Sequence, residues 1–166
     1  MTKVGPGASA SKQQLAALML LGDLRATESA ASAKSLYDQA LQLALAQRDM
    51  ATEAELRIRL ARVLAADGEI EPALQLAERS LALYQSVRDR PHEADTLSLL
   101  GTLNRNAGRL PSAIEYHERA LALYRALRDR SREAATLLTL SSMDPSQESA
   151  AESQQKAIRL LQPSTP

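Results

Sequence analysis

Apolar residues recur along most of this chain at intervals of three and four positions, the spacing that places them on one face of an α-helix. The pattern begins near Lys12, where leucines fall at every third position from Leu15 to Leu24, with Met19 and Leu20 between them. The first helix is therefore apolar on nearly every side. A helix of that kind is either buried all round or waits for a partner that covers it.

Glycine and proline indicate where the following helices end and begin. Gly68 and Gly108 can take the left-handed conformation that ends a helix without strain, and Pro91 and Pro111 suit the first turn of a helix, where no N–H is needed. Ser131 is expected to cap the seventh helix. The whole pattern predicts eight helices, at about residues 12–25, 27–48, 51–66, 69–88, 91–106, 111–127, 132–142 and 145–162.

Three stretches at intervals of forty positions resemble one another. Residues 121–130 closely match residues 81–90, and residues 41–49 form an earlier and weaker copy with the same Arg-Asp pair near its end. A fixed period of this length indicates a repeat protein. Each helical hairpin is too small to bury its apolar face alone, so we expect successive hairpins to stack.

The third repeat has the clearest signature, in small and apolar residues at Leu97, Leu100, Gly101, Gly108, Ala113 and Ala120. This spacing resembles the tetratricopeptide repeat (TPR), and the period of 40 resembles the long-repeat TPRs of polarity adaptors, kinesin light chains and bacterial regulators. The resemblance implies an all-α fold, a right-handed α-solenoid of about four antiparallel helix hairpins. The expected TPR domain is residues 12–162, with hairpins at about 12–48, 51–88, 91–128 and 131–162 and disordered tails at 1–11 and 163–166.

Small residues inside the helices indicate close packing within each hairpin. Gly101 costs about 0.5–1 kcal/mol relative to alanine inside a helix, so we expect a partner helix to approach it closely. Ala33, Ala73 and Ala113 are expected to lie where a larger side chain would push the hairpin apart. His117 falls where the family often has an aromatic packing residue, and we expect it to pack rather than bind a ligand.

Composition and charge narrow the class of protein. Aromatic residues make up 2% of the chain, which suits closely packed helices and disfavours a β-sandwich. Twenty basic residues balance twenty acidic ones, which argues against nucleic-acid binding. The charge is uneven, since residues 49–78 hold three arginines against seven acids and residues 79–132 hold ten arginines against six. This distribution fits solvated helix faces, a bipolar groove or a head-to-tail contact.

The chain contains no motif of a catalytic or metal site. It has no cysteine, no Gly-x-x-x-x-Gly-Lys phosphate loop and no Gly-x-Ser-x-Gly nucleophile motif. His92 and His117 are each followed by Glu but not by a second histidine four positions on, so neither forms a zinc motif. We therefore expect no enzyme activity, no catalytic residue, no metal and no cofactor.

The N-terminus lacks the apolar core of a signal peptide, and no run of about 18 apolar residues occurs. We therefore expect a cytoplasmic protein. Met1 and the loose N-terminal tail favour a complete start, whereas the bare apolar first helix favours a module cut from a larger protein.

The TPR resemblance also implies a binding surface, because stacked TPR hairpins form a concave groove lined mainly by the first helix of each pair. At the groove positions of the family this chain has Met19, Asp23, Ile58, Arg59, Arg62, Ser98, Thr102, Arg105, Leu138 and Ser142. The fork of an arginine can bond both oxygens of a carboxylate, so Arg59, Arg62 and Arg105 indicate an acidic ligand. The lysine and asparagine clamp of chaperone-binding TPRs is absent from these positions.

These patterns leave three functions open. The first is a protein–protein interaction scaffold or adaptor that binds a peptide or helix of a partner protein in the groove. The second is a sensor or oligomerisation module of a larger, bacterial regulatory protein, whose effector part lies outside this chain. The third is a homodimer formed through the apolar first helix. None of the three involves nucleic acid or a membrane.

Overall fold

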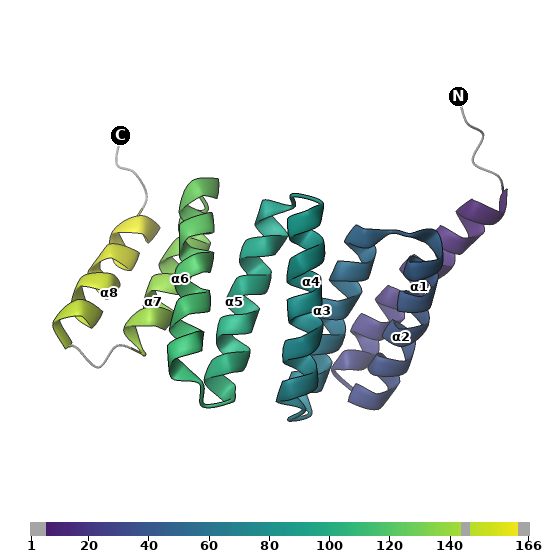
Figure 1. Cartoon of the computed structure of the whole chain (residues 1–166), viewed down its shortest axis with the longest axis horizontal. Coiled ribbons are helices and arrows are strands. Elements are labelled where there is room, and N and C mark those ends of the chain that lie inside the picture. Colours follow the sequence, from purple (N-terminus) through teal and green to yellow (C-terminus); the bar gives the residue numbers. More distant parts are fainter. Residues whose placement is uncertain (1–5, 144–146, 163–166) are drawn as a thin grey trace. The chain divides into compact units, whose positions relative to one another are not determined.

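Eight α-helices joined by short turns make up the described part of the chain (Figure 1). The computed structural model describes residues 6–143 and 147–162, with the side chains of residues 11–143 and 150–162, and no strand occurs among them. The helices are α1 (Pro6–Ala26), α2 (Ala30–Gln47), α3 (Met50–Ala66), α4 (Ile70–Ser86), α5 (Arg90–Asn106), α6 (Leu110–Leu127), α7 (Arg130–Ser141) and α8 (Gln147–Leu161). The all-α class expected from the sequence is confirmed.

Three helix starts differ from the sequence pattern by two residues or more. α2 begins at Ala30, three residues after the predicted start, with Ser29 as its N-cap. α1 begins at Pro6, so residues 6–11, which were expected in a disordered tail, are helical. The prediction that Ser131 caps α7 is wrong, because the Asp129 carboxylate accepts the capping hydrogen bond from the Arg132 backbone N–H. Residues 1–5 and 163–166 of the expected tails, and the expected start of the eighth helix at Pro145, lie outside the described residues.

Within two of the hairpins the turn depends on a glycine, as expected. Gly68 after α3 and Gly108 after α5 have φ of 86° and 75°, in the left-handed region. The residue after each glycine donates its N–H to a carbonyl five residues back, at 2.8 Å in both turns. This hydrogen bond satisfies a carbonyl that would otherwise be left without a partner at the helix end.

Between hairpins the chain turns through the repeated Arg-Asp pair. Arg48, Arg88 and Arg128 lie in the left-handed region, with φ of 54°, 59° and 58°. The aspartate after each arginine accepts a hydrogen bond from the backbone N–H three residues on, at 3.1, 3.2 and 3.0 Å. One residue of the pair ends a helix and the other caps the next, which explains why the pair recurs with the period.

The chain divides into two compact units, and the boundary lies within α4. The N-terminal unit comprises residues 1–83 and the C-terminal unit residues 84–166. In the N-terminal unit α2 packs against both α1 and α3, and in the C-terminal unit α5, α6, α7 and α8 pack in chain order. Sequential packing of this kind is the arrangement expected of a repeat protein.

Alanine and leucine form the cores, and the small side chains keep the helices close. The core of the N-terminal unit joins α1, α2 and α3 through Leu15, Ala33, Tyr37, Ala40, Ala44, Leu56, Leu60 and Val63. A core cluster of the C-terminal unit joins α6, α7 and α8 through Leu121, Ala134, Leu137 and Ala157. The burial expected for Ala33, Ala73 and Ala113 is confirmed, since all three are fully buried.

An aromatic ring lies over a glycine in two of the hairpins. A Cβ on Gly22 would come within 2.3 Å of the Tyr37 ring, and a Cβ on Gly101 would come within 2.6 Å of the His117 ring. In the second hairpin alanines occupy both matching positions. The close approach expected at Gly101 is therefore confirmed, and the ring of His117 is what approaches it.

Candidate functional site

The ten residues expected to line a groove are divided between the two units. The N-terminal unit holds Met19, Asp23, Ile58, Arg59 and Arg62, and the C-terminal unit holds Ser98, Thr102, Arg105, Leu138 and Ser142. Nine lie on the first helices α1, α3, α5 and α7, and the tenth directly follows α7. Five of them are exposed, namely Asp23, Arg62, Arg105, Leu138 and Ser142, and the other five are half-buried.

In the N-terminal unit the structure brings two of these residues into direct contact. Arg59 of α3 donates one hydrogen bond from Nη1 to Asp23 Oδ1 of α1 and another from Nη2 to Glu55 Oε1, at 2.5 Å. The Tyr37 hydroxyl of α2 donates to the same Asp23 oxygen at 2.7 Å. Asp23, Tyr37 and Arg59 thus form a triad that links three successive helices.

The electrostatics of this triad keep Asp23 and Arg59 charged and Tyr37 neutral. Burial opposes the charge on Arg59, but hydrogen bonds to Glu55 and Asp23 outweigh it and raise the pKa of the guanidinium. Burial would likewise raise the pKa of Asp23, but hydrogen bonds from Tyr37 and Arg59 lower it below 3.8. Burial and the hydrogen bond to Asp23 raise the pKa of Tyr37 to about 12. An incoming carboxylate would have to compete with two existing ones for Arg59.

The C-terminal unit contains a second triad of the same residue types. The Tyr124 hydroxyl of α6 donates to Asp95 Oδ1 of α5 at 2.8 Å, and Arg132 Nε of α7 lies 2.9 Å from the same oxygen. Arg132 also pairs with Asp129, Nη1 to Oδ2 at 2.7 Å. Burial, and then the hydrogen bond to Asp95, raise the pKa of the Tyr124 hydroxyl. This triad joins α5, α6 and α7.

Sequence reasoning missed the second triad. Tyr84 and Tyr124 recur forty positions apart in the sequence, which favours packing, and Tyr124 is buried. Nothing in the spacing singled out Asp95 or Arg132, because 37 residues separate the two partners. Both triads connect the first hairpin of a unit to the next first helix, so their role in the fold is to hold hairpins together.

Arg62 and Arg105 differ from the arginines of the triads. Arg62 of α3 and Arg105 of α5 are exposed, and neither has a hydrogen bond or ion pair within the described part of the chain. Their guanidinium groups are therefore free to bond an external carboxylate. The two lie in different units.

The polar groove candidates of the C-terminal unit bond to their own helices. The Thr102 hydroxyl donates to the Ser98 carbonyl at 3.2 Å, and the two residues lie on one face of α5 because they are four positions apart. The Ser142 hydroxyl donates to the Thr139 carbonyl at 2.7 Å. Leu138, four residues before Ser142, has 43% of its surface exposed. This part of α7 therefore presents an apolar side chain to solvent.

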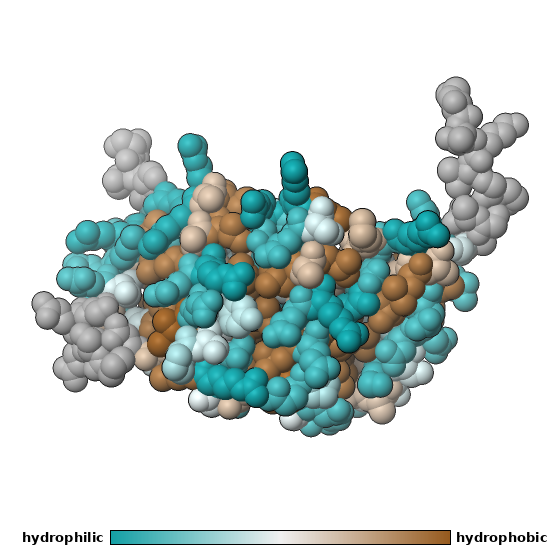
Figure 2. Space-filling model, viewed as in Figure 1, coloured by the Kyte–Doolittle hydropathy of each residue, from teal (hydrophilic) through white to brown (hydrophobic). Residues whose placement is uncertain are grey.

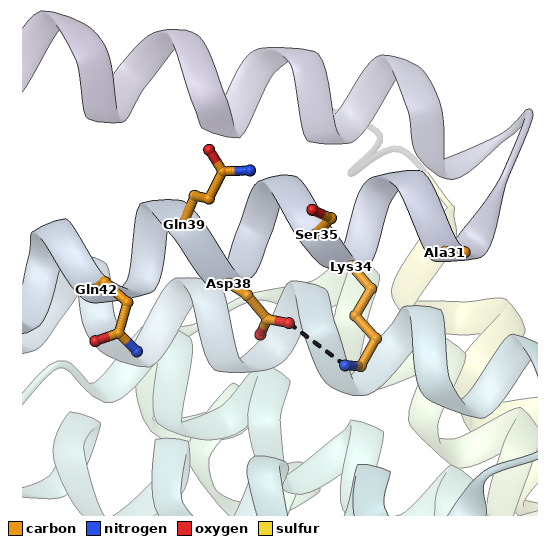
Figure 3. A pocket seen from close by; sticks show the side chains of 6 residues that line it. All are labelled: Ala31, Lys34, Ser35, Asp38, Gln39 and Gln42. Carbon is orange, nitrogen blue, oxygen red and sulfur yellow. Dashed lines mark hydrogen bonds and ion pairs between the residues drawn. The ribbon is translucent and has the colours of Figure 1, made fainter.

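Two hollows in the N-terminal unit lie away from the expected groove residues. One, of about 520 Å³, is lined by α2 alone, through Ala31, Lys34, Ser35, Asp38, Gln39 and Gln42 (Figure 3). Figure 3 shows Gln39 pointing away from the Lys34–Asp38 ion pair, so these side chains do not converge on a ligand. The hollow is a feature of one helix surface.

The second hollow, of about 270 Å³, has an apolar floor. It is lined by Lys34, Asp38, Leu41, Leu60, Leu64, Pro72, Gln75, Leu76 and Arg79, from α2, α3 and α4. Leu60 and Leu64 lie on a different face of α3 from Ile58 and Arg62, because positions two apart point in nearly opposite directions on a helix. In the face drawn in Figure 2, apolar surface shows between polar side chains and does not form one continuous patch.

The histidines are not arranged as ligands. His117 is 2% exposed, and both ring nitrogens lack a hydrogen-bond partner among the described residues. Burial and the nearby charge of Arg105 lower its pKa below 6.5. His92 is exposed, stacks on the Tyr84 ring with centroids 5.1 Å apart, and its Nδ1 lies 2.8 Å from Asp89 Oδ2. The packing role expected for His117 is confirmed by its burial against Gly101.

No group of three or more His, Cys, Asp or Glu side chains in the described part of the chain is placed to hold a metal ion. Among the same residues, no helix combines the length and the apolar character needed to cross a membrane.

Comparison with known proteins agrees with this architecture. Residues 49–126 match the family model of the tetratricopeptide repeat, and no curated protein matches the sequence. The chain resembles the crystal structure of BtubC (BKLC) from P. vanneervenii, with 22% sequence identity and a TM-score of 0.73 over 89% of this chain. It spans 60% of the length of that protein.

Two further solved structures carry TPR-type repeats. One is a putative kinesin light chain of Podosopora anserina with nearly identical TPR-like repeats, at 18% identity and a TM-score of 0.71, covering 96% of this chain and 78% of that one. The other is the TPR domain of Arabidopsis FLU, at 19% identity and a TM-score of 0.66, covering 70% of this chain and 98% of that one. These likenesses establish the TPR solenoid fold class. Residues 49–126 thus resemble the tetratricopeptide repeat, and the chain has the TPR solenoid fold with a period of 40.

Proposed function

We propose that this chain is a non-catalytic, cytoplasmic scaffold or adaptor that binds an acidic peptide or helix of a partner protein on its first helices. The TPR fold generally mediates protein–protein interaction, which supports a protein as the partner. The observation that carries the proposal is the state of the arginines. Arg59 is held by two carboxylates, whereas Arg62 and Arg105 are exposed and unpaired within the described residues.

The variant that tests this proposal combines Arg62→Glu with Arg105→Glu. Neither side chain holds the fold, so helicity measured by circular dichroism should not change. Tagged wild-type chain and variant are each used to capture proteins from a lysate of the source cells, and the captured proteins are quantified by mass spectrometry. Reversing both charges repels an acidic partner, and we expect its capture to fall at least about tenfold.

Arg79→Glu is the matched control, because Arg79 is also an exposed arginine but lies on α4, at the rim of the apolar-floored hollow. Capture should survive this change. If capture survives the double variant and falls with Arg79→Glu, the partner binds the second helices instead. The two single variants then show which unit contributes more to binding.

A second function is favoured by the exposed leucines of α1. Leu20, Leu21 and Leu24 are 71%, 47% and 59% exposed, which suits a sensor or oligomerisation module that docks on another part of a larger regulator. An effector domain encoded in the same reading frame as this chain would support this alternative. An adaptor acting alone would instead retain full partner binding as the isolated chain.

A further inference from the structure

Each unit contains one complete interface between the second helix of a hairpin and the first helix of the next. In the N-terminal unit, Ala40 and Ala44 of α2 share a core cluster with Leu60 and Val63 of α3. In the C-terminal unit, Leu121 of α6 clusters with Ala134 and Leu137 of α7. The chain therefore builds the same kind of contact, second helix against next first helix, in both units.

The first helix α1 has the apolar surface of a first helix in such an interface, but no second helix covers it among the described residues. Leu21 and Leu24 correspond by the repeat to Leu60 and Val63, which are 2% and 8% exposed against α2. In α1 the same positions are 47% and 59% exposed. Apolar residues thus occupy the positions where a helix that ends a repeat array would have polar ones.

The last helix α8 carries the complementary half. Ile158 takes the place of Leu121 in the repeat, because the last hairpin is three residues shorter and Ala157 takes the place of Ala120. Leu121 is 7% exposed and clusters with the next first helix. Ile158 is 56% exposed, and Leu161, three residues after it on the same face, is 58% exposed. α8 is thus a second helix with no first helix on its outer side among the described residues.

We propose that the protein associates with itself head to tail, α8 of one copy packing against α1 of the next as α2 packs against α3. The occupant is a second copy because one chain carries both halves of an interface that it already forms in each unit. An isologous contact of α1 with α1 has no such precedent, since the extensive helix contacts within the units join successive helices. The contact is heterologous, so it leaves one free face of each kind and can extend beyond a dimer.

Two variants and their mixture test the proposal on the whole chain. Leu24→Glu blocks the α1 face and Leu161→Glu blocks the α8 face, and neither should alter helicity because both side chains are exposed. Sedimentation velocity is measured for each from micromolar to submillimolar concentration. Wild type should form dimers and longer species, and each single variant should associate at least about tenfold more weakly. An equimolar mixture should restore a dimer of one copy of each variant, because the Leu24→Glu chain keeps its α8 face and the Leu161→Glu chain keeps its α1 face.

Leu45→Glu is the matched control. Leu45 is 40% exposed and lies on α2, which is neither of the two helices in the proposed contact, so its variant should associate like wild type. A monomeric wild-type chain over the whole range would overturn the proposal. So would a dimer of the Leu161→Glu chain alone, which indicates contact through α1 with α1. None of these changes touches Arg62 or Arg105, so failure here leaves partner binding at the first helices to be judged separately.

Discussion

At the scale of single residues, the most unusual feature is a buried imidazole that has no polar partner in the described part of the chain. His117 is 2% exposed and neither of its ring nitrogens is hydrogen-bonded among the described residues. Gly101 makes room for its ring. An ionised histidine in this place would be costly, because a buried charge without a partner loses its hydration. The ring is therefore neutral in the folded chain, and folding should depend on pH.

The sign of that dependence follows from the pKa. Burial and the charge of Arg105 lower the folded-state pKa of His117 below 6.5, so the unfolded chain binds a proton first as pH falls. The contribution of the neutral His117 ring to the free energy of unfolding is therefore fully present above pH 6.5 and decreases as the pH falls below that value. Asp23 and Asp129, whose pKa values are lowered below 3.8, lose their contribution in a more acidic range.

His117→Phe tests this dependence. The phenyl ring keeps the contact with Gly101 and cannot be protonated, so the loss of stability between about pH 7 and pH 5 should shrink in the variant. The measurement is the free energy of unfolding in urea at several pH values. If the free energy of unfolding changes equally with pH in wild type and in His117→Phe, then His117 has the same pKa in the folded and unfolded states and the prediction is wrong.

The pairing of glycine with a ring can be tested by a double-mutant cycle. Gly101→Ala should gain about 0.5–1 kcal/mol from helix propensity, but a Cβ 2.6 Å from the His117 ring requires a shift. The cost of overpacking should exceed this gain, so the free energy of unfolding should fall by about 1–3 kcal/mol in total. In a His117→Ala background the same change should stabilise, because Ala61 and Ala77 form that pair in the second hairpin. An effect of Gly101→Ala that is equal in both backgrounds, measured by denaturant unfolding, would contradict the packing described.

At the scale of the element, the Arg-Asp turn shows what periodicity can predict and what it cannot. The sequence shows that Arg128 and Asp129 recur at the period, but an arginine in the left-handed conformation is uncommon, so the pattern alone does not place the start of a helix at this pair. Ser131 therefore looked like the cap. In the structure the helix begins one residue after Asp129.

Replacing each of the two candidate caps by alanine separates them. Asp129→Ala should cost about 0.5–2 kcal/mol, because the Arg132 N–H loses its acceptor. Ser131→Ala should change stability by no more than about 0.5 kcal/mol, since an exposed side chain outside the cap contributes little. Thermal or chemical unfolding of the two variants side by side gives the answer. A larger loss of stability from Ser131→Ala than from Asp129→Ala would contradict this and favour Ser131 as the cap.

At the scale of the whole molecule, the sequence predicts the repeat better than it predicts the contacts of the expected groove residues. Helices, glycine turns and the burial of Ala113 and His117 follow from local spacing, because each depends on residues within one hairpin. Asp23 and Arg59 lie 36 positions apart in the chain and on different helices, so their pairing cannot be predicted from local spacing. Three arginines were expected to bind an acidic ligand. Spacing alone could not show that one of them, Arg59, is already paired with two carboxylates of the same chain. That distinction needed the side-chain contacts.

The two triads make a final prediction about cooperativity. Tyr37→Phe and Tyr124→Phe each remove one hydroxyl that donates to an aspartate, at a cost of about 0.5–1.5 kcal/mol. In a repeat protein each hairpin is stabilised mainly by its neighbours, so we expect amide hydrogen exchange to quicken mainly in residues 1–83 for Tyr37→Phe and in residues 84–166 for Tyr124→Phe. Ser35→Ala is the control, since it removes an exposed hydroxyl that belongs to neither triad. Equal quickening in both units by either change would show that the whole chain opens as one cooperative block, because the weakening of one triad would then lower the protection of every helix.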